Sequence, residues 1–276
     1  MTLAVVTGAS AGIGTEIALG LAKQGITVIV HGRDPLRTQA VRERIVRGGG
    51  KAEALLADFA RLDDVQRFAR EAAALHPAID ILVNNAGTAS SERTVTAEGF
   101  ETTFAVNHLA PYLLTRLLLD RLHAAPNARI VTVASGAHKR GRMELENLQR
   151  VHSYTAWDAY AQSKLANVLF TRALAKRLEG TNVTATCCHP GMVATDIWGI
   201  SPLVRLVAPI AKLFMKSPAQ GAETPLWLST SADVQGQSGG YYAKRKLART
   251  APAAQDDFAA EILWQRSARM TRVHWA

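Results

Sequence analysis

Short apolar runs alternate with longer helical patterns along almost the whole chain. Several of the runs are apolar throughout, as in strands that are buried on both faces of a sheet. Strands that alternate with helices predict βαβ units, and these units build a parallel sheet. We expect about seven strands, at Leu3–Thr7, Thr27–His31, Ala52–Ala57, Ile79–Asn84, Arg129–Ala134, Val183–Cys188 and, more briefly, Gly240–Ala243.

Helical patterns fill the intervals between these strands. Glycine favours the position just past a helix end, so Gly25 is expected to end one helix and Gly48 the next. The expected helices are Ile13–Gln24, Leu36–Arg47, Thr96–Leu122 and Tyr154–Leu178, followed by an amphipathic, basic extension over 252–272. Neither a repeat nor a linker interrupts the 276 residues, of which 48% are hydrophobic, so we expect a single α/β domain over 1–276.

Composition argues against several other classes of protein. The chain contains no uninterrupted run of 18 or more apolar residues, the length that a membrane-spanning helix needs. The apolar start at Leu3 lacks the basic region of a secretory leader. The adjacent Cys187 and Cys188 can neither cross-link distant segments nor supply metal-ligand spacing. We therefore expect a cytoplasmic protein with reduced thiols, no stable membrane anchor and no metal site.

The formal charge of +9 raises nucleic-acid binding as a hypothesis. However, the basic residues are spread along the chain without a basic tract, so no nucleic-acid partner is expected. The stretch 31–51 is more strongly basic, and it fits either a solvated helix face or a region of positive potential for a phosphate.

Residues 201–215 are apolar and are interrupted by Pro202 and Pro209. Three interpretations stay open: a buried helix pair, a hydrophobic lid over a substrate pocket near 192–220, or a helix on a membrane surface. Only Arg205 and Lys212 would supply basic anchors for the last.

A glycine-rich turn follows the first strand directly and precedes the first helix. Gly8, Gly12 and Gly14, with Ser10 and Ile13 between them, have the spacing Gly-x-x-x-Gly-x-Gly. Such glycines let the backbone approach a pyrophosphate at a helix N-terminus, where unpaired N–H groups favour an anion. Three glycines alone are weak evidence, but strand, turn and helix together within 25 residues are stronger.

Tyr160 and Lys164 are four residues apart and would share one face of a helix. A phenol with a pKa of about 10 is a poor acid or base at neutral pH, and a nearby ammonium lowers that pKa. An ordinary helix surface is the alternative for an isolated pair of this kind.

The glycine spacing and Tyr160-x-x-x-Lys164 together resemble the classical short-chain dehydrogenases/reductases, and the resemblance covers nearly the whole chain. It implies a doubly wound Rossmann sheet with helices on both faces and a nicotinamide over the carboxyl ends of the strands. Further matches occur in the family's order, although each one alone also fits a purely structural role.

The resemblance assigns a role to each of these matches. Asn107 would belong to a proton relay and Ser135 would orient the substrate carbonyl, while Tyr160 donates the proton and Lys164 lowers its pKa and holds the ribose. Asn84-Asn85-Ala86-Gly87 would lie beside the adenine ribose, and Asp58 would meet the adenine. The implied cofactor-binding residues are Gly8, Ser10, Gly12, Ile13, Gly14, Arg33, Asp58, Asn85, Ala86, Gly87, Tyr160, Lys164, Pro190, Gly191, Val193 and Thr195.

The end of the second strand predicts NADP(H). Gly32 stands where NAD-preferring relatives tend to carry an acid, and Arg33 follows, whose guanidinium suits a 2′-phosphate. Two residues weaken this prediction. Ala11 replaces a basic residue found in many NADP-dependent relatives, and Asp34 lies beside Arg33, where it could instead cap the next helix.

Within the family, Val106-Asn107-His108-Leu109, Ser135-Gly136-Ala137-His138 and His189-Pro190-Gly191 resemble the branch of retinol dehydrogenase-like and WW-domain oxidoreductase-like proteins. That branch implies a lipophilic ketone, aldehyde or alcohol as substrate. Many relatives in the family pair through two long helices, here 96–122 and 154–178, so a monomer or a homodimer is expected. His138 and His189 could touch substrate or cofactor, or could simply pack. The alternative function is a catalytically idle NADP(H)-binding regulator or scaffold.

Overall fold

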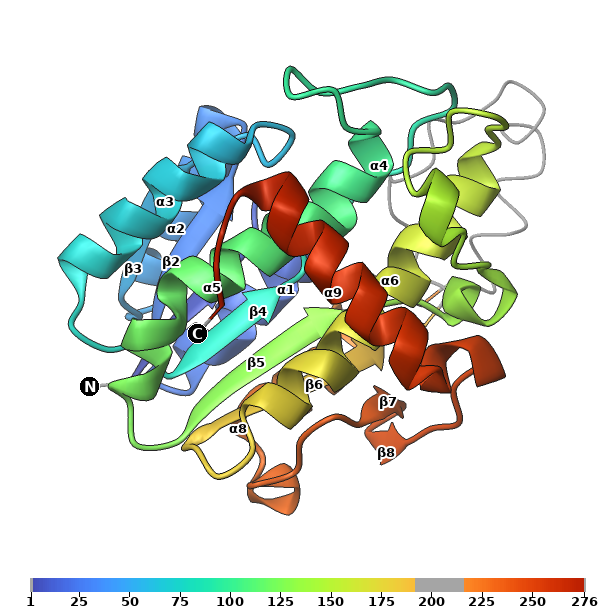
Figure 1. The fold of residues 1–276 in the computed structure, drawn as a ribbon. Helices are drawn as coiled ribbons and strands as arrows, with labels where there is room; N and C mark the ends of the chain where they lie inside the picture. The colour runs from blue at the N-terminus through green and yellow to red at the C-terminus, as the bar shows by residue number, and fades with distance from the viewer. Residues whose placement is uncertain (1, 192–215, 276) are drawn as a thin grey trace.

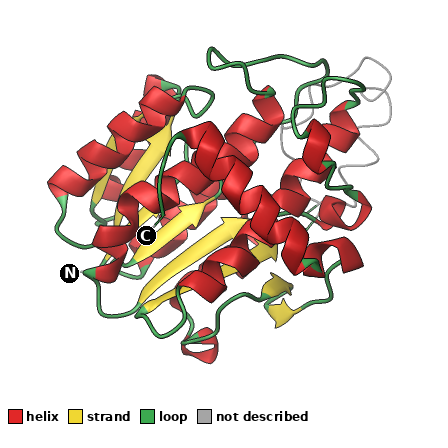
Figure 2. Ribbon diagram, in the orientation of Figure 1, coloured by secondary structure: helices red, strands yellow, loops and turns green. Residues whose placement is uncertain are grey.

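The computed structural model describes residues 2–191 and 216–275 and is built on one central sheet (Figures 1 and 2). The strand order is β3-β2-β1-β4-β5-β6-β7-β8, and all neighbours are parallel except the final pair. The strands are β1 Leu3–Val6, β2 Thr27–Gly32, β3 Ala52–Leu56, β4 Ile81–Asn84, β5 Ala128–Val133, β6 Val183–His189, β7 Tyr241–Ala243 and β8 Lys246–Leu247.

Helices cover both faces of the sheet, as a doubly wound fold requires. One face carries α3 (Leu62–Leu75), α5 (Ala110–His123), α6 (Ala156–Arg177) and α9 (Asp257–Thr271). The other carries α1 (Gly12–Lys23), α2 (Pro35–Arg47) and α8 (Pro218–Thr230). Shorter helical turns are α4 (Thr102–Phe104), η1 (Ala105–Leu109), η2 (Gly136–Arg140), η3 (Leu145–Asn147), η4 (Ala232–Val234) and η5 (Pro252–Gln255).

Alternation along the strands divides the hydrophobic core into two layers. Val5 and Ile29 face the layer that contains α3 and α5, while Val6 and Val28 face the layer that contains α1 and α2. All four side chains are fully buried. Strands covered on both faces in this way explain the uninterrupted apolar runs of the sequence.

The predicted fold class is confirmed, with two local differences. The sheet has eight strands rather than about seven, because the chain turns back after β7 through Lys244 and Arg245, both at positive φ, and adds the short β8. The helix expected at Thr96–Leu122 starts only at Thr102. The preceding residues form a turn closed by an isolated bridge between Val95 and Glu101, and the Glu101 carboxylate then caps the helix.

The predicted lid over 201–215 lies outside the described residues, as does most of 192–220. The last residues of the range 192–220, Ser217 to Gln220, form the capped start of α8. Beyond Pro252, η5 and α9 pack on the domain, and α9 crosses α5 and α6 in Figure 1. None of the helices described here is long and apolar enough to cross a membrane.

Candidate active site

The glycine turn lies at the carboxyl end of β1, where its backbone leaves the N-terminus of α1 open. Gly8 and Gly12 have φ values of 62° and 57°, a left-handed conformation in which L side chains are strained. A Cβ on Gly14 would lie 2.2 Å from the carbonyl oxygen of Gly8. Ala11 occupies the N-cap position and gives the helix no side-chain cap. The first N–H groups of α1 are thus suited to a phosphate oxygen.

Thr7 joins the glycine turn to the end of β4. Its hydroxyl donates to the carbonyl oxygen of Val83 at 3.2 Å and accepts the backbone N–H groups of Asn85 and Ala86 at 2.9 and 3.0 Å. The Asn85 amide returns the contact by donating to the carbonyl oxygens of Thr7 and Gly8. Our sequence reasoning missed Thr7, although a threonine between a strand and a glycine turn could have indicated it.

His31 supports the same turn from β2 and was also missed. Its Nδ1 accepts the backbone N–H of Gly8 at 3.0 Å, so the ring hydrogen is on Nε2, which donates to the carbonyl oxygen of Ala57. Burial lowers the pKa of His31 to about 4. The imidazole is therefore neutral at physiological pH and binds the turn as an acceptor.

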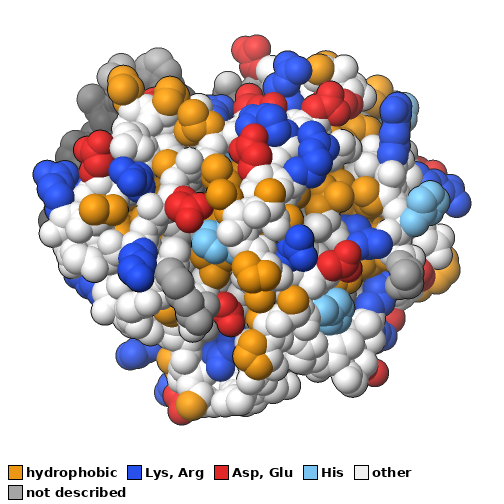
Figure 3. All heavy atoms as spheres, turned by 90° about the vertical axis from the view of Figure 1, so that its left-hand side faces the viewer, with side chains coloured by type: hydrophobic (Ala, Val, Ile, Leu, Met, Phe, Trp, Pro, Cys, Tyr) orange, Lys and Arg blue, Asp and Glu red, His pale blue; other side chains and the backbone are white. Residues whose placement is uncertain are grey.

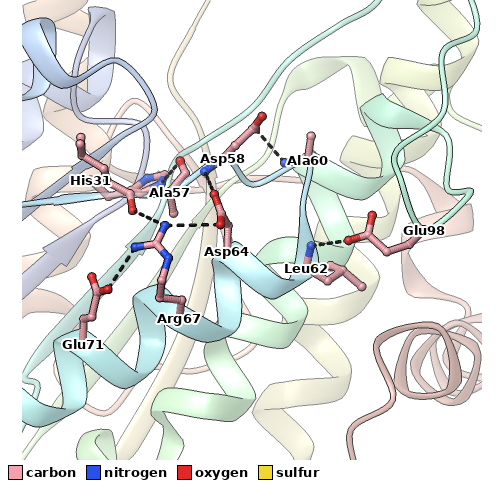
Figure 4. Close-up of polar contacts among 10 residues, drawn as sticks. His31, Ala57, Asp58, Ala60, Leu62, Asp64, Arg67, Glu71 and Glu98 are labelled. Carbon is pink, nitrogen blue, oxygen red and sulfur yellow. Dashed lines mark hydrogen bonds and ion pairs between the residues drawn. The ribbon is translucent and has the colours of Figure 1, made fainter.

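Asp58 follows β3, and its carboxylate accepts the backbone N–H of Ala60 at 3.0 Å (Figure 4). It does not cap α3, whose N-cap residue is Arg61. Asp64 instead accepts the Asp58 backbone N–H, and Arg67 binds both Asp64 and the carbonyl oxygen of Leu56. These contacts fix the loop that carries Asp58, the residue for which the sequence resemblance predicts a contact with the adenine.

Tyr160 and Lys164 both lie on α6, with the Lys164 Nζ 5.6 Å from the centre of the Tyr160 ring. Lys164 is buried and donates to the carbonyl oxygen of Val133 at the end of β5. Burial lowers the pKa of Lys164 to about 8, and the nearby Cys188 opposes part of this lowering. Burial also raises the pKa of Tyr160, while a hydrogen bond with Ser135 lowers it. In the protein alone, burial thus opposes the ammonium effect that the spacing suggests.

Asn107 lies in η1, a π-helical segment that leads into α5. Pro111, four residues later, has no N–H to give to the Asn107 carbonyl, and this loss favours the wider turn. The Asn107 amide donates to Thr88 O and Ser163 Oγ, both at 2.9 Å, and accepts from Thr88 N at 2.7 Å. Ser163, the residue before Lys164, was also missed by sequence reasoning. Its hydrogen bond with Asn107 joins α6 to η1.

Ser135 follows β5, and its Oγ accepts the backbone N–H of Ala137. Across the site, Gly87 follows β4 so closely that a Cβ there would lie 3.3 Å from the Asn107 Oδ1 and 3.5 Å from the Lys164 Nζ. The structure therefore brings Asn107, Ser135, Tyr160, Lys164 and Gly87 together at the carboxyl ends of β4 and β5.

The remaining predicted cofactor residues fall into two groups. Ser10, Arg33 and Asn85 line the carboxyl ends of β1, β2 and β4, and Pro190 and Gly191 follow β6. Val193 and Thr195 lie outside the described residues. No group of three or more potential ligand side chains that could hold a metal ion occurs within 2–191 and 216–275.

A doubly wound sheet, a phosphate-ready glycine turn and a buried tyrosine–lysine pair together define a nicotinamide-dependent oxidoreductase. Comparison with known families gives the same class. Residues 2–201 match the family model described as short chain dehydrogenase. The chain belongs to this family of alcohol and carbonyl oxidoreductases.

Individual relatives place the chain more narrowly. It is 40% identical to dehydrogenase/reductase SDR family member 13 of Bos taurus, over 97% of this chain and 72% of that protein. It is 38% identical to retinol dehydrogenase 14 of Mus musculus, over 98% of this chain and 85% of that protein. These similarities confirm the retinol dehydrogenase-like branch.

Solved structures agree with the fold. A protein from Mycobacterium Paratuberculosis aligns with a TM-score of 0.83 and 31% identity, covering 100% of this chain and 95% of its own. A 3-oxoacyl (acyl-carrier-protein) reductase from Agrobacterium tumefaciens C58, solved with NADP bound, aligns with a TM-score of 0.71 and 26% identity, covering 87% of this chain and 91% of its own.

Proposed function

We propose that the protein is an NADP(H)-dependent oxidoreductase that interconverts a lipophilic ketone or aldehyde and its alcohol. The observation that carries the proposal is the convergence of Tyr160, Lys164, Ser135 and Asn107 at the strand ends beside the glycine turn. These four side chains come from three separate segments of the chain, so their meeting is a property of the fold.

Each of the four has a role that fits its contacts. The Tyr160 hydroxyl donates a proton to the carbonyl oxygen in the reductive direction, and Ser135 binds that same oxygen. The bound nicotinamide supplies the hydride. Lys164 is anchored on Val133 O, and its charge favours the phenolate that Tyr160 leaves behind. Asn107 holds Ser163 and the loop after β4 in place, beside the relay that returns a proton to Tyr160.

Support for NADP(H) comes from the end of β2. Arg33 is exposed there and takes part in no ion pair with another residue in 2–191 or 216–275. Asp34 caps α2 by accepting the Arg37 backbone N–H, as the alternative for this residue predicted. The Arg33 guanidinium is thus available for a 2′-phosphate. The NADP bound by the Agrobacterium tumefaciens relative is consistent with this proposal.

A lipophilic substrate is supported by the names of the relatives. Retinol, the substrate that several of those names state, is a lipophilic alcohol. Of the relatives' properties, we propose only this class of substrate for the chain. The proposal also includes a single catalytic domain, a lid near 192–220, and a monomer or homodimer as the active unit. A cytoplasmic location stays part of the same proposal.

Tyr160→Phe tests the function directly. We expect NADPH oxidation with a panel of lipophilic aldehydes and ketones to fall by a factor of about a hundred or more, because general acid catalysis is lost. NADPH binding, followed by fluorescence, should survive. Tyr154→Phe is the matched control, since its hydroxyl donates to the carbonyl oxygen of Ser90 and belongs to none of the four proposed catalytic residues.

Two results would contradict the proposal. Full turnover in Tyr160→Phe would remove the assigned acid. A wild-type protein that binds NADPH but oxidises it with no carbonyl of the panel would favour the idle regulator instead.

A further inference from the structure

Two histidines bind the two polar ends of one peptide group, the one that joins Ser135 to Gly136. The carbonyl oxygen of Ser135 accepts from the Nδ1 of His138 at 2.6 Å. The N–H of Gly136 donates to the Nδ1 of His189 at 3.1 Å. His138 belongs to η2 and His189 ends β6, so the peptide is held between two separate elements.

The partners determine which nitrogen of each ring carries the hydrogen. A carbonyl oxygen only accepts, so His138 is protonated on Nδ1. Its Nε2 then accepts the backbone N–H of Ala251 at 3.4 Å. A backbone N–H only donates, so the Nδ1 of His189 is bare and its hydrogen is on Nε2. A second proton on either ring would break one of these hydrogen bonds.

Both rings are also fixed by packing. His138 is fully buried, and its ring lies edge-on to Tyr241 of β7, with 4.7 Å between ring centres. The His189 ring lies close against Gly136, where an added Cβ would be 3.4 Å from its Nε2. The peptide group is thus tied to β6, to β7 and to the residue that precedes η5.

We propose that His138 and His189 are positioning residues that set the orientation of the Ser135–Gly136 peptide and so aim the Ser135 hydroxyl at the substrate carbonyl. The peptide plane fixes the ψ angle of Ser135, which is 157°, and with it the frame from which the side chain projects. The inference rests on the proposed role of Ser135 and deepens it. It also gives both histidines a role beyond packing.

The same orientation reaches Tyr160 through Ser135. The hydrogen bond between these two side chains lowers the pKa of Tyr160 against the opposing effect of burial. A loosened Ser135 should therefore raise the apparent pKa of Tyr160. The described groups that act on the His189 charge are His138, Lys216 and Lys139; with burial as the main cause, they lower its pKa to about 4. The His189 ring thus stays neutral through the assay range.

Paired amide substitutions separate positioning from packing. Asn places an amide group near the Nδ1 position of a histidine, whereas Gln places it near Nε2. We therefore compare His189→Asn with His189→Gln, and His138→Asn with His138→Gln. All four variants stay polar and close in size to the imidazole, and His138→Leu and His189→Leu remove the side-chain contact. The backbone N–H of residue 138 also donates to the Ser135 carbonyl oxygen, at 3.2 Å, and this bond is present in every variant.

We expect the Gln and Leu variants to lose about tenfold or more in kcat, while the Kd for NADPH stays within about twofold. In the Gln and Leu variants, the alkaline limb of the plot of kcat against pH, which reports the pKa of Tyr160, should move to higher pH. The Asn variants should keep most of the kcat and the wild-type profile. NADPH binding shows that each variant is folded, so a Leu variant that fails to fold leaves the Asn and Gln comparison to decide.

Three results would overturn the inference: wild-type kcat and pH profile in the Gln variants, equal losses in Asn and Gln, or a loss confined to the Kd for NADPH. Ser135→Ala distinguishes this failure from failure of the proposed function. Full activity in Ser135→Ala would remove the role assigned to Ser135 itself. A loss of activity there, with active Gln variants, would reject only the histidine positioning.

Discussion

At the scale of single residues, the missing side chain at Gly32 bears on the proposed preference for NADP(H). A Cβ at this position would lie 2.2 Å from the Thr38 Oγ1 and 2.7 Å from the Ser10 Cβ. A carboxylate at residue 32 would therefore displace both neighbours. The chain therefore carries no acid at this position to hold an adenosine ribose, and the exposed Arg33 is the next residue along the chain.

Arg33→Ala should accordingly change cofactor preference. We expect the KM for NADPH to rise about tenfold or more relative to that for NADH, because a charge-assisted contact with the 2′-phosphate is lost. Arg37→Ala is the matched control, since this guanidinium lies 3.6 Å from the Asp34 carboxylate on the same exposed end of α2. An unchanged ratio of the two KM values in Arg33→Ala would refute the NADP(H) assignment.

At the scale of elements, α9 holds the outer side of the helical layer together. Trp264 is buried, stacks on Phe170 of α6 with ring centres 5.8 Å apart, and lies 5.0 Å from the Tyr112 ring of α5. The Arg177 guanidinium covers the indole at 4.1 Å. The Ser267 hydroxyl of α9 binds His108, the residue after Asn107. This helix therefore supports η1 from outside the site.

Trp264→Ala should remove much of that support. Truncation of a buried aromatic side chain costs about 3–5 kcal/mol, and we expect a loss of that size in the free energy of unfolding measured in urea. Phe258→Ala on the same helix is the control, because its side chain is 73% exposed. Similar losses in both variants would show that the aromatic cluster does not anchor α9.

For the whole molecule, buried histidines link stability to pH. Burial lowers the pKa values of His31, His108 and His189 to about 4, 3 and 4, from an ordinary value of 6.5. The unfolded chain binds protons near pH 6.5, but the folded chain does not. The stability from these neutral rings is therefore complete above pH 6.5 and is lost as the pH falls toward 4.

The free energy of unfolding should fall by about 2–3 kcal/mol for each of the two fully buried rings, His31 and His108, between pH 6.5 and 4, and by less for the partly exposed His189. Urea melts at several pH values measure the slope. His31→Asn should make the slope shallower, whereas the same change at the exposed His152 should leave it unchanged. A slope that does not respond to His31→Asn would contradict the assignment.

Charge at the same scale bears on partners. On the face shown in Figure 3, acidic and basic side chains are interspersed. Although the net charge is +9, this face therefore shows no continuous basic patch of the kind that nucleic-acid binding uses.

Much of the architecture could be predicted because periodicity is local. The apolar runs predicted the parallel strands, and Gly25 and the glycines after Arg47 indicated where α1 and α2 end. Two features depended on contacts that are distant in the sequence. The late start of the helix at Thr102 follows from the bridge between Val95 and Glu101, and β8 pairs only with an existing β7.

The sequence by itself determined the fold class, the family and the residue types of the candidate site, because strand and helix periods, the glycine spacing and the Tyr160–Lys164 spacing are all short-range patterns. Only the tertiary structure decided how these groups meet. The contacts of Thr7 with Val83, of Asn107 with Ser163 and of His189 with Gly136 join residues that lie 76, 56 and 53 positions apart. Burial, which reverses the expected effect on the Tyr160 pKa, likewise depends on the packing of the whole chain around it.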